Sequence, residues 1–195
     1  IEPSRIPSPD GKRIGTQPLH NSNNTQYWQA QAIQQRGNPY TLVIAVEAHS
    51  RFSLILPFAR VPSQDEFEEE FLSHMMKNLV GLLLHHGILN PDDPKFAIDH
   101  ILGSVNDISW VHNTDLSVNG HVKDTEQWLY SFQEHYNKIQ INAADVAELE
   151  DHVNDMVKKD KKGKSKEDFI SVPRFIDDAI ERFDIMGNQA EEPAA

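Results

Sequence analysis

The sequence predicts an α+β fold, in which a small, mainly antiparallel sheet is packed with helices and followed by a C-terminal helical extension. Two apolar stretches, Tyr40 to Ala48 and Arg51 to Phe58, are separated by only His49-Ser50, which indicates a β-hairpin. The next segment has apolar residues at helical spacing, so a long helix follows the hairpin. A parallel α/β sheet is disfavoured, because so short a connection cannot join parallel strands.

Besides Arg51 to Phe58, strands are expected in three places. Residues 25 to 33 contain Trp28 and Ile33 and precede the turn-prone Arg36 to Pro39, so a first strand fits there, with a short helix as the alternative. The nearly continuous apolar run from Leu42 to Val46 is typical of a central strand that is covered on both faces. A further strand is expected at Ile108 to His112.

The long helix has the clearest start and end signals in the chain. Ser63 and Glu66 have the spacing of a capping box, and acidic residues follow where the helix dipole favours them. Gly87 is the expected stop. Matched apolar periodicity predicts that one helix face packs on the sheet. The expected contact joins Phe71, Met75, Leu79 and Leu82 of the helix to Leu42, Ile44, Val46, Leu54 and Leu56 of the sheet.

Four more helices are expected, together with a solvated linker. The helices are predicted from Asn90 to Ile101 with Gly103 as terminator, from Val122 to His135, from Ala143 to Val157 with Asn142 as cap, and from Val172 to Phe183. The lysine-rich segment from Lys158 to Lys166 is expected to be the linker. The resulting division is an extended arm (1–24), a core domain (25–137), a helical extension (138–188) and a mobile tail (189–195).

Composition excludes several classes of function. The chain has 18 Lys and Arg against 30 Asp and Glu, a formal charge of −12, so we do not expect it to bind duplex nucleic acid. Without cysteine it has no disulfide or thiolate site, which favours a reducing compartment, and we expect a cytoplasmic protein. The longest apolar stretch, Leu79 to Leu84, is far shorter than a membrane span, and the N-terminus shows no secretory signal.

Two segments resemble a known family. Residues Arg51 to Pro57 and Thr114 to Asp124 are similar to motifs of the domain of unknown function 6933, an uncharacterised bacterial family, and the likeness spans about residues 15 to 135. The matching positions are Trp28, Arg36, Arg51, Phe52, Ser53, Pro57, Thr114, Ser117, Val118, Gly120 and Asp124. The chain departs from the family pattern at Leu116, which replaces an arginine, and at His121 and Lys123, which replace serine and asparagine. The resemblance implies a shared fold and no activity, and any function of that arginine is lost or altered here.

The segment from Ser117 to Asp124 is the candidate ligand site. We expect it to connect a strand end to a helix start, where backbone N–H groups receive an anion or a polar ligand. The candidate ligand-binding residues are Thr114, Ser117, Asn119, Gly120, His121, Lys123 and Asp124. The structural alternative is that Ser117 or Asn119 caps the helix, Gly120 relieves backbone strain and Asp124 bonds the first-turn amides.

No catalytic residue, metal or cofactor is predicted. His121 and Asp124 could orient an imidazole towards Ser117, but the serine has no G-x-S-x-G motif around it. Glu70 and His74 lie four residues apart, yet the ten histidines form no converging ligand pattern. The tryptophans Trp28, Trp110 and Trp128 are expected in the core rather than in a base-stacking platform.

The expected function is that of a non-enzymatic interaction module, which binds a protein partner or a second copy of itself. The alternative is a small hydrolase or nucleotide-handling enzyme with its site at residues 114 to 124. A deep polar pocket at Ser117, His121 and Asp124 would favour the enzyme. A broad apolar patch would favour the module, and it is expected along Phe175, Ile176, Ile180 and Phe183.

Overall fold

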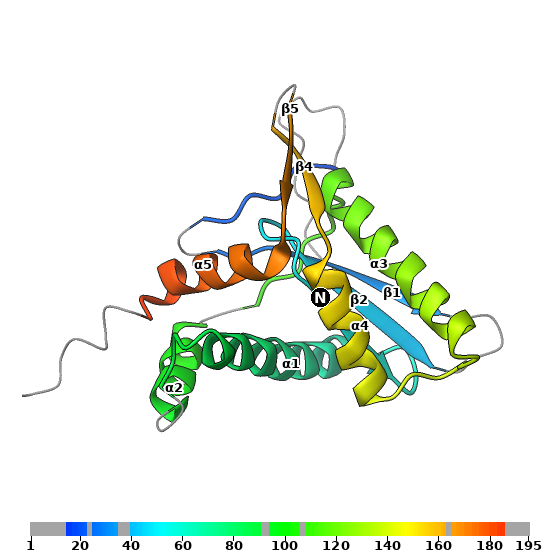
Figure 1. Ribbon diagram of the computed structural model, residues 1–195, viewed down its shortest axis with the longest axis horizontal. Coiled ribbons are helices and arrows are strands. Elements are labelled where there is room, and N and C mark those ends of the chain that lie inside the picture. Colours follow the sequence, from blue (N-terminus) through cyan, green and yellow to red (C-terminus); the bar gives the residue numbers. More distant parts are fainter. Residues whose placement is uncertain are drawn as a thin grey trace, which may run out of the picture.

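The computed structural model describes residues 15–22, 25–34, 40–90, 94–105, 108–162 and 165–185, and these form an α+β arrangement (Figure 1). The predicted tail at 189–195 and most of the predicted arm lie outside the described residues. In chain order the elements are β1 (Trp28–Gln34), β2 (Thr41–Glu47), β3 (Ser53–Phe58), α1 (Gln64–His85), α2 (Pro94–Ser104), α3 (Leu116–His135), α4 (Ala143–Asp155), β4 (Lys158–Lys162), β5 (Ser165–Phe169) and α5 (Ser171–Phe183).

The main sheet is antiparallel, with β2 between β1 and β3. All seven residues of β2 are buried, which confirms the prediction of a central strand covered on both faces. The predicted hairpin is also confirmed, although its connection is longer than two residues, because β2 ends at Glu47 and β3 begins at Ser53. Among the described residues, no helix is both long and apolar enough to cross a membrane.

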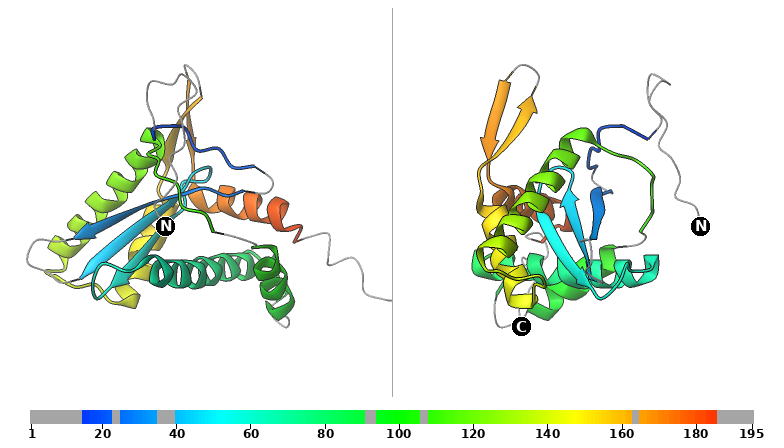
Figure 2. Two further views of the ribbon diagram at one scale, coloured as in Figure 1. Left: turned by 180° about the vertical axis from the view of Figure 1, so that it is seen from behind. Right: turned by 90° about the vertical axis from the view of Figure 1, so that its right-hand side faces the viewer.

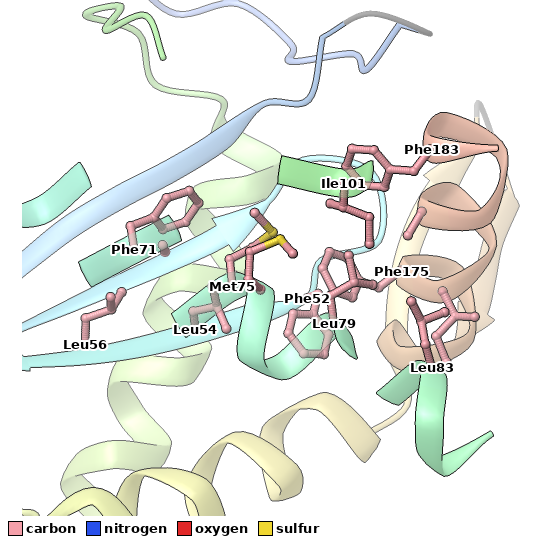
Figure 3. Close-up of a cluster of buried hydrophobic side chains, with 14 of the residues drawn as sticks. Phe52, Leu54, Leu56, Phe71, Met75, Leu79, Leu83, Ile101, Phe175 and Phe183 are labelled. Carbon is pink, nitrogen blue, oxygen red and sulfur yellow. The ribbon is translucent and has the colours of Figure 1, made fainter. Parts of the chain in front are cut away.

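One face of the sheet packs against α1, α2 and α5 (Figure 3). Leu54 and Leu56 point to this face and meet Phe71, Met75 and Leu79 of α1, as predicted. The prediction was wrong for Leu42, Ile44 and Val46, which belong to the cluster on the opposite face. The reason is the period of two along a strand: Val43 and Ala45, the register partners of Leu56 and Leu54, are the β2 residues that face α1.

The other face packs against α3 and α4. Val118, Val122 and Leu129 of α3 and Val146, Leu149 and Val153 of α4 complete the cluster around Ile44 and Val46. The segment predicted as a helical extension therefore supplies α4 to this cluster and α5 to the first one.

Helix α5 is a core element rather than an exposed docking face. Phe175, Ile176 and Phe183 are buried, and the Phe175 ring stacks on Phe52 at a centroid distance of 4.3 Å. Ile180 is partly buried against the same cluster. The apolar patch expected along these residues is thus covered by the sheet and α1, and it marks no docking surface.

Helix α4 covers the outer edge of β3. The Asn154 side chain accepts a hydrogen bond from Ser53 N at 2.8 Å and donates one to Ser53 O at 2.9 Å. Glu150 accepts from Ile55 N at 2.5 Å and from the His74 ring of α1 at 2.8 Å. These side chains occupy backbone groups that would otherwise be open to another strand.

The start of α1 agrees with its sequence signals. Ser63 and Glu66 form the predicted capping box, and Gly87 has a φ of 67° just after the C-cap His86. Hydrogen bonds from the Ser63 backbone and the Arg60 side chain lower the pKa of Glu66 to about 2. The carboxylate therefore stays ionised over the whole neutral range and keeps the cap formed.

Residues 108 to 112 do not form the predicted strand of the main sheet. Trp110 instead packs against Phe67 of α1 at a centroid distance of 5.3 Å, and its indole N–H donates to Glu68. These contacts attach the segment to the helix, so its backbone is not paired with β1.

The predicted lysine-rich linker is a β-hairpin. Strands β4 and β5 pair antiparallel from Lys158 with Phe169 to Lys162 with Ser165. The hairpin projects from the body of the molecule between α4 and α5 (Figure 2). The many lysines of this segment indicated exposure to solvent. They did not reveal that β4 and β5 pair with each other.

Candidate functional site

The region predicted as a strand-to-helix loop is the first part of α3. Asp115 is the N-cap, and its Oδ1 accepts from the backbone N–H of Ser117 at 2.7 Å and of Val118 at 3.2 Å. The predicted start at Val122 was therefore six residues too late, and neither Ser117 nor Asn119 is the cap. Gly120 lies inside the helix, where a Cβ atom would meet no other atom within 4 Å. It therefore relieves no backbone strain. Asp124 is likewise too far into the helix to bond its first-turn amides.

The structure separates the candidate residues onto different sides of α3. Ser117, His121 and Asp124 follow a spacing of four and three residues and share one side of the helix. Asn119 accepts a hydrogen bond from Gln29 of β1 at 3.2 Å. Gly120 and Lys123 are exposed, and Thr114 precedes the cap, where its backbone N–H donates to Gly15 O at 2.8 Å.

The N-terminal segment 15–22 is fixed against the start of α3. The Asn113 side chain accepts from Gln17 N at 2.8 Å and donates to Gln17 O at 2.9 Å. Asp115 Oδ2 accepts from Leu19 N at 2.7 Å, and the Leu19 side chain is buried. Two side chains next to the helix start thus hold this part of the predicted arm in one place.

The turn between β2 and β3 is organised by a buried carboxylate. Glu47 is fully buried, and its Oε2 accepts from His49 N at 3.0 Å, Ser50 N at 2.5 Å and Ser50 Oγ at 2.6 Å. Its Oε1 accepts from the Asn21 side chain at 2.6 Å, which links the turn to the N-terminal segment. Arg51 closes the turn with a φ of 61°, in the left-handed region.

Arg51 joins the two motif segments. Its side chain is buried, with one guanidinium nitrogen donating to Ala48 O and the other to Ser117 Oγ at 3.1 Å. Arg51 and Ser117 are 66 residues apart in the chain, so the fold brings the two segments together at this contact. A guanidinium whose two terminal nitrogens are both hydrogen-bonded is a pre-positioned cation.

These three parts enclose a cleft of about 630 Å³. Its walls are the N-terminal segment, the β2–β3 turn and the first turn of α3. The lining residues are Thr16, Gln17, Pro18, Leu19, His20, Asn21, Ala48, His49, Arg51, Asp115, Leu116 and Ser117. The volume lies in the range of small-molecule sites. Of the predicted site residues, Ser117 lines the cleft, and the neighbouring Leu116 lines it as well.

The Gln17 amide nitrogen is a buried donor without a hydrogen-bond partner. The Gln17 backbone is held by Asn113, so the side chain starts from a fixed point in the wall of the cleft. Buried polar groups in proteins are nearly always bonded. A donor left over in a cleft wall is therefore suited to a ligand acceptor.

The side chain of Lys158 contacts the backbone of Arg51. The Lys158 ammonium donates to Arg51 O at 2.6 Å. Burial, and to a lesser extent the positive charge of Arg51, lower the pKa of Lys158 to about 7, although Asp124 acts in the opposite direction. The depressed pKa therefore reflects mainly the removal of the ammonium group from water.

The described residues contain no cluster of three or more His, Asp or Glu side chains suited to a metal ion. His74, considered with Glu70 in the sequence, is paired with Glu150 instead. Trp28 and Trp110 are partly buried against the α1 cluster, as expected for core residues. Trp128 is 38% exposed and lies edge-on to His152, at a centroid distance of 4.7 Å.

Comparison with protein families gives one match. Residues 9–169 match the model of a domain of unknown function, DUF6933. The chain belongs to this family. The match is longer than the motif likeness in the sequence, and it reaches through α4 and the β4–β5 hairpin. No curated protein and no solved structure matches the chain.

Sequence reasoning missed much of the cleft. Gln17 and Asn21 fall in a segment whose prolines and asparagines indicated an arm, and Lys158 falls in the supposed linker. The signal that could have located the cleft was Arg51. The family resemblance had marked this residue as a matching position, without a role. Arg36, another matching position, lies outside the described residues.

Proposed function

We propose that this family member is a non-enzymatic binding module and that a ligand or a segment of a protein partner docks in the cleft. The observation that carries the proposal is the contact between Arg51 and Ser117. One residue of each motif segment thereby lines the same cleft. A cytoplasmic location, which fits a chain without cysteine, belongs to the same proposal.

The same contact favours binding over catalysis. A nucleophilic serine needs a base that takes its proton, and the Arg51 guanidinium that donates to Ser117 Oγ is no base, so this contact positions the hydroxyl without activating it. The alternative of a small hydrolase or nucleotide-handling enzyme requires His121 or Asp124 to act on Ser117. It would be supported by ester or nucleotide hydrolysis that disappears in Ser117→Ala.

The cleft can be tested by blocking it. Leu116 is 66% exposed in the cleft lining, so Leu116→Trp should narrow the opening without disturbing the core. Leu102→Trp is the matched control, because Leu102 is 47% exposed on α2 and does not line the cleft. The probes are N-acetyl tripeptides and small organic acids, and the measurement is a two-dimensional NMR titration of the labelled full chain.

The expected result is saturable shifts of backbone amides in residues 16–21, 48–51 and 116–117. Binding should be weaker in Leu116→Trp and unchanged in Leu102→Trp. Equal binding in both variants, or shifts confined to another surface, would contradict the cleft as the docking site.

A further inference from the structure

Building on the proposed function, we infer that the cleft recognises its ligand through a carboxylate group, which seats against the Arg51 guanidinium and the Gln17 amide. Both side chains line the cleft, one as a positioned cation and the other as a buried donor. The ligand class is therefore a small carboxylic acid or the carboxyl end of a short peptide.

The donor set matches the two oxygens of a carboxylate. A guanidinium presents N–H groups in a planar fork that pairs with carboxylate geometry. The Gln17 amide adds a neutral donor that has no hydrogen-bond partner within the protein. A ligand oxygen would satisfy that donor, so binding removes an unfavourable feature of the empty cleft.

The charges in the cleft also favour an anion. Asp115 is the carboxylate in the lining, and its oxygens are already engaged by the backbone N–H groups of Leu19, Ser117 and Val118. His20 and His49 are exposed in the lining, and Lys158 contacts the backbone of Arg51, although burial lowers its pKa to about 7 and leaves it only partly protonated at neutral pH. The buried Glu47 carboxylate of the turn is likewise engaged, by Ser50 and Asn21, so Arg51 is the charged side chain of the lining that a ligand anion would meet.

A single negative charge fits better than a multiply charged group. The net charge of −12 repels anions at long range, and this cost rises with the charge of the ligand. The remaining lining includes Pro18, Leu19, Ala48 and Leu116, which can contact an apolar body. These features together favour an apolar carboxylate over phosphate.

The first test compares each acid with its own amide. The probes are N-acetyl-alanyl-leucine and 4-methylpentanoate, each as free acid and as carboxamide, with inorganic phosphate as a different anion. Isothermal titration should show binding of an acid that is at least about tenfold tighter than that of its amide, because a charged hydrogen-bonding group is lost. The two acids distinguish a peptide end from a small molecule.

The second test removes the Gln17 donor at nearly constant volume. Gln17→Met should weaken acid binding about tenfold and leave the melting temperature unchanged or raised, because it deletes an unsatisfied polar group. A merely structural glutamine would lower the melting temperature instead. Gln127→Met, at an exposed position of α3, is the matched control and should change neither quantity.

The outcomes separate this inference from the proposed function. Acids and amides that bind the cleft equally, tighter binding of phosphate than of the acids, or full affinity in Gln17→Met would each overturn the carboxylate assignment and leave the docking cleft standing. If no acid, amide or tripeptide shifts the cleft amides up to its solubility limit, both conclusions fail.

Discussion

The covering of the β3 edge by α4 gives the sharpest test of the fold. Asn154 is 2% exposed and bonds both backbone groups of Ser53. Replacing Asn154 with alanine leaves one buried N–H and one buried C=O without a partner. At about 1–3 kcal/mol for each unsatisfied group, the free energy of unfolding should fall by about 2–6 kcal/mol. That is a large share of the about 5–15 kcal/mol by which domains are stable.

The variant Asn154→Asp refines the test, because it keeps the shape of the side chain. An ionised aspartate still accepts from Ser53 N, but it sets a carboxylate oxygen against Ser53 O. We expect it to be destabilising at neutral pH, and the loss should shrink in acid as the carboxyl becomes protonated and can donate. Asp155→Ala, an exposed change on the same helix, should stay within about 0.5 kcal/mol of the wild type.

Urea unfolding followed by tryptophan fluorescence measures these differences as shifts of the midpoint at constant slope. The reasoning would be refuted if Asn154→Ala unfolded at the same midpoint as Asp155→Ala. A change of slope instead would mean that the denatured or the native state had changed its compactness.

Two further predictions concern α3 and Lys158. Gly120→Ala should stabilise the protein by about 0.5–1 kcal/mol, because alanine favours the helix and its Cβ meets no atom within 4 Å. Gly87→Ala should instead destabilise the protein, since φ is 67° at that position. Calorimetry of both variants checks these two changes. Burial lowers the pKa of Lys158 in the folded state to about 7 from its ordinary value of 10.5. The unfolded chain therefore binds more protons between these pH values, and this group makes the stability rise with pH. The stability of Lys158→Met relative to the wild type should therefore be greatest below pH 7 and fall towards pH 10.5, and a pH-independent difference in urea midpoints would contradict this.

Local signals predicted the elements better than their packing. The capping box at Ser63 and Glu66 depends on neighbouring residues, and the sequence located that helix start correctly. The same reasoning placed the start of α3 too late, because Gly120 was taken for a turn residue. In the structure, Asp115 caps the helix and buried contacts of Val118 and Val122 outweigh the low helix propensity of glycine.

Long-range features could not be predicted in the same way. The division of β2 side chains between two helical layers follows from alternation, but the sequence does not state which layer covers which side. The cleft depends on pairings such as Gln17 with Asn113 and Arg51 with Ser117. Such pairings join polar residues of distant segments and leave no periodic pattern, so Ser117 could be predicted as a candidate site residue but its partner Arg51 could not.

The attachment of the N-terminal segment to the start of α3 sets the order in which the cleft can assemble. The hydrogen bonds of Gln17 with Asn113 and of Leu19 with Asp115 each span 96 residues. During synthesis the first wall leaves the ribosome long before the residues that hold it, and closing so long a loop is entropically costly. The cleft is therefore a late product of folding, and a nascent chain has no binding capacity until Asn113 and Asp115 have been made.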